Sequence, residues 1–316
     1  MSQEKTHPVD ELTDPQLREL MLRVDSTGFP GNLDQLFQVE RVRYRETLRR
    51  IPPAAHPEAT LLDLGSSRPW LPFFQGLLGY RKIVLNTCYP ESGFVEDRLA
   101  VACAPSADVR MSVFDVERDP FPHADESFDV VLCLEVIEHL AVDPMAMAAE
   151  VNRVLKPGGL FVLTTPNAVR DANIVHMALG EQPMGYVGYN GRDTNRHNRI
   201  YTPAEIGHLF RAAGITPDEV TTIGRKPRGR RRAILKWWAA LAMLPLRRCP
   251  RRWRRDVILA VGRKTSSRVD RRPGWLYFDL GEYALESKQS KQRDRQSVVA
   301  APQASSATDV ASARSA

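Results

Sequence analysis

Short apolar segments alternate with helix-like segments through the middle of the chain, and this alternation limits the fold more than any other feature. Five buried strands are expected, at 60–64, 82–85, 109–114, 128–134 and 160–164. Helices are expected between and after them, at 70–78, 144–155 and 203–213. Strands that are apolar throughout indicate a parallel sheet covered by helices on both faces. The expected fold class is therefore α/β, a Rossmann-like doubly wound sheet.

The two ends of the chain have a different character. Residues 1–31 are interpreted as a weakly structured lead-in with one short helix at 14–23, and 286–316 as a disordered tail without hydrophobic periodicity. Asn32 is a plausible N-cap for a helix through 48, whose apolar stripe is interrupted by Glu40. The folded domain is expected to span 32–285, with two further strands at 219–223 and 257–261.

Polar residues and one glycine stand where the expected strands end. They are Asp63, Gly65, Asn86, Asp115 and Glu135. Ligands of doubly wound sheets bind beyond the carboxyl ends of the strands, so these residues are the first to consider. Glycine allows the backbone to approach a ligand closely, and a carboxylate can accept a hydrogen bond from the exocyclic amine of an adenine. Each residue alone also suits an ordinary strand-to-helix turn.

Two motifs in this order make the interpretation more specific. They are Leu-Glu-Val-Ile-Glu-His-Leu at 134–140 and Arg-Val-Leu-Lys-Pro-Gly-Gly at 153–159. With them, the stretch 61–167 resembles class I S-adenosylmethionine-dependent methyltransferases. The resemblance implies a seven-stranded, mostly parallel sheet whose last strand is antiparallel, and S-adenosylmethionine as the cofactor.

The resemblance also implies how the strand ends would surround the cofactor. Asp63 and Gly65 would border its methionine part, and Asp115 with the backbone of Val116 would hold the adenine. The segment after the fourth strand would line the far wall. The candidate cofactor-binding residues are Asp63, Gly65, Ser66, Asn86, Asp115, Val116, Glu135 and Val136.

The chain departs from the usual family pattern in two places. Only the first glycine of the glycine-rich loop is kept, in the segment 65–70, and Asn86 stands where an acid usually grips the ribose. An amide bonds a diol more weakly than a carboxylate does. These features, with the segments 196–203 and 272–277, resemble a branch of methyltransferases associated with polysaccharide and lipopolysaccharide synthesis.

Three residues are candidates for catalysis of methyl transfer to a hydroxyl, which benefits from a general base. His139 follows the fourth strand, and His197 and Tyr201 follow the fifth. Structural alternatives stand beside these roles, because His139 could cap its turn and the other two could anchor their loop. Glu138 is a possible base or metal ligand, but is interpreted as a solvated acid at a helix start, which suits the helix dipole. No committed metal site is predicted.

The positive charge of the chain is concentrated in one segment. Residues 225–255 hold 13 Lys or Arg and no acid, and removing them from the net charge of +6 leaves −7. Paired Trp237 and Trp238 stand in an apolar stretch between the arginines, a pattern that favours a helix on an anionic membrane surface. The alternatives are a helix packed on the sheet or at a dimer interface, and, ranked last, nucleic-acid binding.

Three functions are compatible with these patterns. The first is O-methylation of a sugar or lipid-linked glycan, the second is methylation of a small natural product or quinone-like lipid, and the third is non-catalytic binding on the same fold. The four cysteines form no close pair, and no signal or spanning segment is seen. A cytoplasmic protein, peripheral at the inner face of the membrane, is expected.

Overall fold

A computed structural model gives the structure of the chain. It describes residues 6–23, 32–66, 68–88, 108–183, 188–189, 194–224 and 250–277. The chain forms two compact units, Met1–Arg271 and Arg272–Ala316, and the fold below is that of the first. In the second unit, 273–277 form a turn in which the Tyr277 amide donates to the Pro273 carbonyl (3.1 Å). The predicted tail at 286–316 and most of the basic segment at 225–255 lie outside the described residues.

The centre of the first unit is a seven-stranded sheet. Its strands are β1 (Thr60–Leu64), β2 (Lys82–Thr87), β3 (Asp108–Val113), β4 (Phe128–Leu134), β5 (Leu155–Pro166), β8 (Ile215–Ile223) and β9 (Val257–Lys264). Their order in the sheet is β3-β2-β1-β4-β5-β9-β8. The first five pair in parallel, whereas β9, the last along the chain, is antiparallel to both β5 and β8. The predicted fold class is confirmed.

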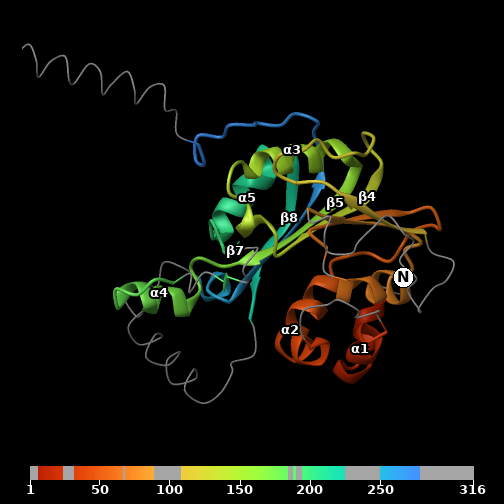
Figure 1. Cartoon of the computed structure of the whole chain (residues 1–316), viewed down its shortest axis with the longest axis horizontal. Helices are drawn as coiled ribbons and strands as arrows, with labels where there is room; N and C mark the ends of the chain where they lie inside the picture. The colour runs from red at the N-terminus through yellow and green to blue at the C-terminus, as the bar shows by residue number, and fades with distance from the viewer. Residues whose placement is uncertain are drawn as a thin grey trace, which may run out of the picture. The chain divides into compact units, whose positions relative to one another are not determined.

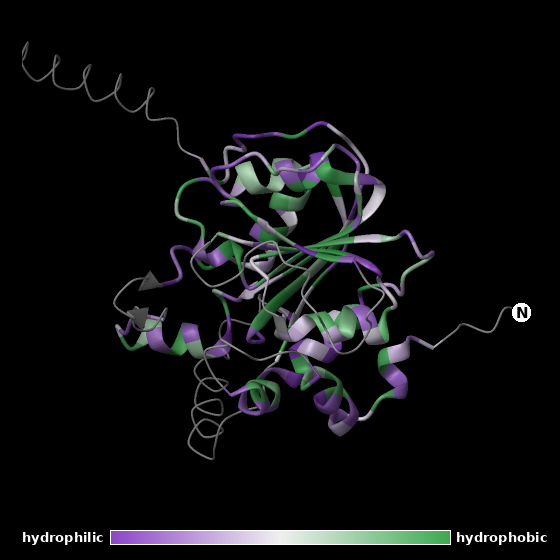
Figure 2. Cartoon of the chain, turned by 45° about the vertical axis from the view of Figure 1, so that its right-hand side comes forward, coloured by the Kyte–Doolittle hydropathy of each residue, from purple (hydrophilic) through white to green (hydrophobic). Residues whose placement is uncertain are grey.

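Helices cover both faces of the sheet, as Figure 1 shows. One face carries α1 (Asp14–Met21) and α2 (Leu33–Leu48), and the other carries α3 (Pro144–Val154) and α5 (Pro203–Ala212). The strands are apolar along most of their length, which Figure 2 makes visible. On the second face, Phe161 of β5 stacks on Phe210 of α5 with ring centroids 5.0 Å apart. Burial of both sheet faces accounts for the apolar strands.

Local capping residues place the helix starts. Asn32 accepts a hydrogen bond from the Gln35 amide (3.1 Å) at the start of α2. Thr202 and Glu205 form a capping box at the start of α5. The predicted segment 70–78 is less regular than expected, because it comprises a 3-10 turn at Arg68–Trp70 and a π-helical turn at Phe73–Leu77. Pro69 and Pro72 remove two backbone donors there, which accounts for the irregular bonding.

The predicted short helix near the N-terminus is present as α1, preceded by a 3-10 turn at Pro8–Glu11. Val9, Leu17 and Met21 have no exposed surface. Arg45 of α2 donates to the Val9 carbonyl (2.8 Å) and to Asp14 (2.9 Å), which ties these residues to α2. The domain boundaries themselves stay a prediction.

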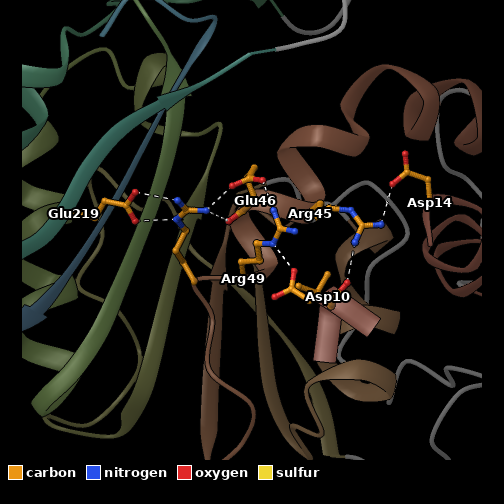
Figure 3. Close-up of polar contacts among 8 residues, drawn as sticks. Asp10, Asp14, Arg45, Glu46, Arg49 and Glu219 are labelled. Atoms are coloured by element: carbon orange, nitrogen blue, oxygen red, sulfur yellow. Dashed lines mark hydrogen bonds and ion pairs between the residues drawn. The ribbon is translucent and has the colours of Figure 1, made fainter. Parts of the chain in front are cut away.

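The end of α2 is in turn attached to the sheet. Arg50 forms two hydrogen bonds with the carboxylate of Glu219 on β8, both of 2.9 Å, and a third with Glu46 (2.7 Å). Arg49 donates to Asp10 (2.6 Å), and Figure 3 shows this chain of ion pairs crossing from the N-terminal residues to β8. A paired guanidinium–carboxylate contact fixes orientation as well as distance.

The remaining described elements are short. They are α4 (Asp171–Ala178), β6 (Gly188–Tyr189), β7 (Thr194–Asn195) and short 3-10 turns at Ile137–His139 and Arg251–Trp253. No helix in the described part of the chain is both long and apolar enough to cross a membrane. Cys133 is a buried free thiol, and Cys103 and Cys249 lie outside the described residues.

Candidate active site

The first loop of the site begins where β1 ends. Gly65 has a φ of +57°, and a Cβ atom there would lie only 2.6 Å from Cγ2 of Val136. The Gly65 amide donates to the side-chain oxygen of Asn86 (3.1 Å), and the Ser66 amide donates to the Asn86 carbonyl (2.8 Å). The structure therefore brings together the ends of β1 and β2 and the segment after β4.

Asp63 is the buried acid of this loop. Its side chain is 1% exposed, and its Oδ2 atom has no hydrogen-bond partner among the described residues. Burial raises the pKa of Asp63 to about 7. A buried carboxylate oxygen without a donor is costly, so its presence indicates that a ligand supplies the donor. The amino group of the methionine part of S-adenosylmethionine is such a donor, and the residues present fit this cofactor.

Asn86 joins the strand ends through its side chain. Its oxygen accepts from Gly65, and its nitrogen donates to the carbonyls of Phe114 (3.0 Å) and Ser112 (3.3 Å). The side chain is 1% exposed, so both ends of the amide serve the backbone. This geometry gives Asn86 a positioning role, and contact with a ribose stays a prediction.

The end of β3 presents a carboxylate to the same edge. The Asp115 side chain is 39% exposed, and its Oδ1 accepts from the Glu117 amide (2.9 Å). Val116 is buried beside it. Glu117, which sequence reasoning missed, accepts backbone hydrogen bonds from Ala141 (3.0 Å) and Asp143 (2.6 Å) and so ties this turn to the start of α3. Its only sequence signal is an acid two residues beyond Asp115.

Glu135 has an unusual backbone and a buried cationic neighbour. Its φ is +60°, which a residue with a side chain rarely adopts and which is enriched at functional sites. Burial alone would lower the pKa of Arg43 of α2, and the charges of Glu135 and Glu40 hold it above its usual value. Arg43 donates to Glu40 (2.9 Å), so the acid that interrupts the apolar stripe of α2 is a buried ion-pair partner.

Aromatic rings complete the surroundings of Arg43. Its guanidinium lies 5.5 Å from the ring centre of Tyr44 and 5.7 Å from that of Trp70. Both rings are buried. Cation–aromatic contacts of this kind stabilise a desolvated guanidinium. Sequence reasoning missed Arg43 because its partners come from three separate segments.

Glu138 is buried, contrary to the expectation of a solvated acid. Its side chain is 1% exposed, and Oε2 accepts from the Thr165 hydroxyl on β5 (3.0 Å). Burial first, and then the nearby charge of Glu135, raise the pKa of Glu138. The prediction of a solvated helix-start acid was wrong because the loop before α5 folds over this turn.

That loop brings His139 and His197 together. Their ring centroids lie 5.0 Å apart, and Nδ1 of His139 is 3.0 Å from the Arg196 carbonyl. The Asn198 side chain donates to the His139 carbonyl (2.6 Å), which fixes the loop on the turn. One potential ligand atom of each of Glu138, His139 and His197 lies within 4.8 Å of the others. The sequence predicted no committed metal site, and that stays a prediction.

Tyr201 is buried, whereas the two histidines are partly exposed. It is 1% exposed, its carbonyl accepts from the Ala168 amide (2.8 Å), and Arg199 lies 5.4 Å from its ring centre. Burial raises the pKa of its hydroxyl, so the phenol remains protonated at neutral pH. Its catalytic role stays a prediction, and the geometry favours the alternative of loop anchoring.

Comparison with known proteins matches this architecture. Residues 37–220, more than half of the chain, match the family model of a methyltransferase domain. The chain belongs to the methyltransferase domain family. This assignment confirms the predicted methyltransferase class. S-adenosylmethionine as the cofactor follows from the family resemblance and belongs to the proposed function. The polysaccharide and lipopolysaccharide branch stays a prediction.

Curated relatives include ubiquinone biosynthesis O-methyltransferases. That of Methylobacterium nodulans is 32% identical over 137 residues, which cover 43% of this chain and 53% of the relative. That of Ruegeria pomeroyi is 36% identical over 164 residues, covering 49% of this chain and 64% of the relative. The chain therefore spans about half of the curated relatives it matches.

A solved structure agrees with the fold. The methyltransferase of Haloferax volcanii, determined in complex with its activator, superposes with a TM-score of 0.50 at 20% identity. The match covers 79% of this chain and 98% of that one. At this identity the likeness supports the arrangement of strands and helices alone.

Proposed function

We propose that this methyltransferase transfers the methyl group of S-adenosylmethionine to a hydroxyl oxygen of a small, quinone-like acceptor with phenolic hydroxyls. The observation that carries the proposal is the pair His139 and His197, partly exposed at the turn that begins after Val136, whose side chain packs on Gly65. Relatives named ubiquinone biosynthesis O-methyltransferases support the choice of acceptor.

Binding of the cofactor follows from the strand ends. Asp63 would accept from the cofactor's amino group, Gly65 would let the backbone approach it, and Asp115 would accept from the adenine amine. The sulfonium methyl is already electrophilic, so the enzyme mainly aligns the acceptor and excludes water. The loop carrying Asn198, which is hydrogen-bonded to His139, would cover the acceptor.

The cost of removing the hydroxyl proton favours a phenol over a sugar. A phenol has a pKa near 10 and an imidazole one near 6.5, whereas an aliphatic hydroxyl resembles water, near 16. Proton transfer to an ordinary imidazole would therefore cost roughly 5 kcal/mol from a phenol and roughly 13 kcal/mol from an aliphatic hydroxyl. A sugar or lipid-linked glycan is the second candidate, because it is the acceptor that the branch resemblance implies.

An acceptor panel tests the proposal. Purified protein is incubated with S-adenosylmethionine and a catechol, a prenylated hydroquinone or a methyl glycoside, and S-adenosylhomocysteine is measured by mass spectrometry. We expect turnover with the phenolic acceptors and none with the glycoside, and loss of turnover in Asp63→Asn. Turnover with the glycoside alone would favour the glycan candidate, and cofactor binding without turnover on any acceptor would favour the non-catalytic alternative.

A lipid acceptor would be met at a membrane, and the basic segment 225–255 is proposed as the docking element. Changing Arg230, Arg231 and Arg232 together to Gln is expected to weaken binding to vesicles of anionic lipid about 100-fold, because each basic residue near such a surface contributes about 1 kcal/mol. Vesicle flotation measures the bound fraction.

The matched control for vesicle binding changes three exposed arginines elsewhere. Arg110, Arg118 and Arg268 are exposed, and their replacement by Gln removes the same charge. We expect this variant to bind anionic vesicles as wild type does. Equal loss in both triple variants would show a general charge effect and would remove the docking role from 225–255.

A further inference from the structure

We propose that Glu138, His139 and His197 bind a divalent transition-metal ion at the carboxyl edge of the sheet. One donor atom of each lies within 4.8 Å of the other two. Glu138 and His139 follow β4, and His197 comes from the loop before α5, so two distant segments meet here. Donors around a four-coordinate ion with bonds of about 2.1 Å stand roughly 3.4 Å apart. Small side-chain rotations would complete the site.

The donor types select the class of ion. Two imidazoles and one carboxylate are a set that holds Zn²⁺, Fe²⁺, Co²⁺ or Mn²⁺, whereas Mg²⁺ and Ca²⁺ prefer oxygen ligands alone. Three protein ligands leave coordination positions open for substrate, as in catalytic rather than structural sites. The expected order of affinity is Zn²⁺ above Co²⁺ above Mn²⁺, with Mg²⁺ weakest.

Hydrogen bonds to groups outside the proposed metal site orient the ligand atoms. Nδ1 of His139 lies 3.0 Å from the Arg196 carbonyl, a contact that holds the proton on Nδ1 and leaves Nε2 as the ligand. Nε2 lies 4.0 Å from Oε1 of Glu138. The other oxygen of Glu138 accepts from Thr165 (3.0 Å), so Oε1 faces the histidine. Second-shell contacts of this kind accompany metal-binding histidines and carboxylates.

Burial gives an independent reason for a cation at this place. The Glu138 side chain is 1% exposed, and its carboxyl accepts from the neutral hydroxyl of Thr165 (3.0 Å). A carboxylate withdrawn from water needs a compensating charge or a metal ion. Arg43 is paired with Glu40 at 2.9 Å on the α2 side of the site, whereas the histidine side of Glu138 is where an ion would stand.

The metal would assist the reaction that we propose, and this part of the inference rests on that proposal. A bound divalent cation lowers the pKa of a coordinated hydroxyl by several units. The two histidines would then act on the acceptor by holding the ion next to its oxygen. Such assistance would lower the cost of removing the proton from a phenolic acceptor.

Calorimetric titration of the tag-free, full-length protein with Co²⁺ tests the site directly. We expect one ion per chain, bound at least tenfold more tightly than Mg²⁺. His139→Ala, His197→Ala and Glu138→Gln are each expected to weaken Co²⁺ binding tenfold or more. The matched control is His176→Ala, because His176 also pairs with a carboxylate, Glu181 at 2.6 Å, and its exposure of 38% is close to the 36% of His139.

The outcomes separate the metal from the methyl transfer. Thermal unfolding of each variant identifies any that fails to fold. If Glu138→Gln does not fold, the two histidine variants still test the metal site. Absence of Co²⁺ binding by wild type, or equal binding by the histidine variants, would overturn the metal site. Phenol methylation in the presence of a chelator would leave the proposed function intact, whereas metal binding without any methylation would remove that function alone.

Discussion

Replacing Asp63 by Asn is expected to stabilise the fold above neutral pH and to weaken cofactor binding 10- to 100-fold. Burial raises the pKa of the Asp63 carboxyl to about 7 in the folded chain, against about 4 in the unfolded chain. Between about pH 4 and pH 7 the folded chain therefore binds the proton of Asp63 more tightly than the unfolded chain does. Stability falls as the pH rises through this window, and the full penalty is reached above pH 7.

Asparagine has nearly the same volume as aspartate but its amide does not ionise. The Asp63→Asn variant therefore avoids the free-energy cost of burying the charged carboxylate. The gain in unfolding free energy over wild type should grow by about 2–3 kcal/mol between pH 5 and pH 8. Urea unfolding at the two pH values measures it. Binding changes in the opposite sense, because a neutral acceptor loses roughly 1.5–3 kcal/mol of a charge-assisted hydrogen bond. Calorimetry with S-adenosylhomocysteine measures that loss.

Asp129→Asn is the control of opposite sign for the pH experiment. Burial alone would raise the pKa of Asp129, but hydrogen bonds from Lys156 (2.8 Å) and Thr60 (2.8 Å) hold it below its usual range. Its carboxylate therefore stabilises the fold at neutral pH, and this contribution is lost as the pH falls through the folded pKa. Asp129→Asn should destabilise the protein at pH 8. A pH dependence in Asp63→Asn equal to that of wild type would contradict the assignment of Asp63.

Gly65→Ala is expected to destabilise the protein by about 2–4 kcal/mol and to weaken cofactor binding more than tenfold. The new Cβ would meet Cγ2 of Val136 at 2.6 Å, so the loop must move. The φ of +57° adds a backbone cost of about 1 kcal/mol for a residue with a side chain. Because the loop passes close to the cofactor, its displacement affects binding as well as stability. Thermal unfolding and calorimetry measure the two effects.

Two further variants separate the contact from the backbone strain. Gly180 has a φ of +74° and nothing within 4 Å of a Cβ added there, so Gly180→Ala should show the backbone cost alone. Combining Gly65→Ala with Val136→Ala removes the clashing methyl groups and should recover part of the stability. Equal losses in Gly65→Ala and Gly180→Ala would show that the packing of Val136 on Gly65 is unimportant.

The sequence by itself determined the strands of the central sheet and most of the helices that cover it. The structure agrees with the predicted strand positions and with the helix starts at Asn32 and Pro203. It also agrees with the antiparallel last strand that the family resemblance implied. These features depend on interactions within a few residues, such as the bond from Gln35 to Asn32, or on runs of apolar residues. Local hydrogen bonding and hydrophobic periodicity are written directly into neighbouring positions, so they can be predicted from one chain.

Only the tertiary structure decided which charged side chains are buried and which of them meet. Glu40 interrupts a stripe in the sequence but pairs with Arg43 in the folded chain, and Glu138 is enclosed by a loop that begins more than fifty residues later. His139 and His197 are neighbours for the same reason. The free energy of a charge depends on its distance from water and from partners far along the chain, and no local pattern encodes either quantity.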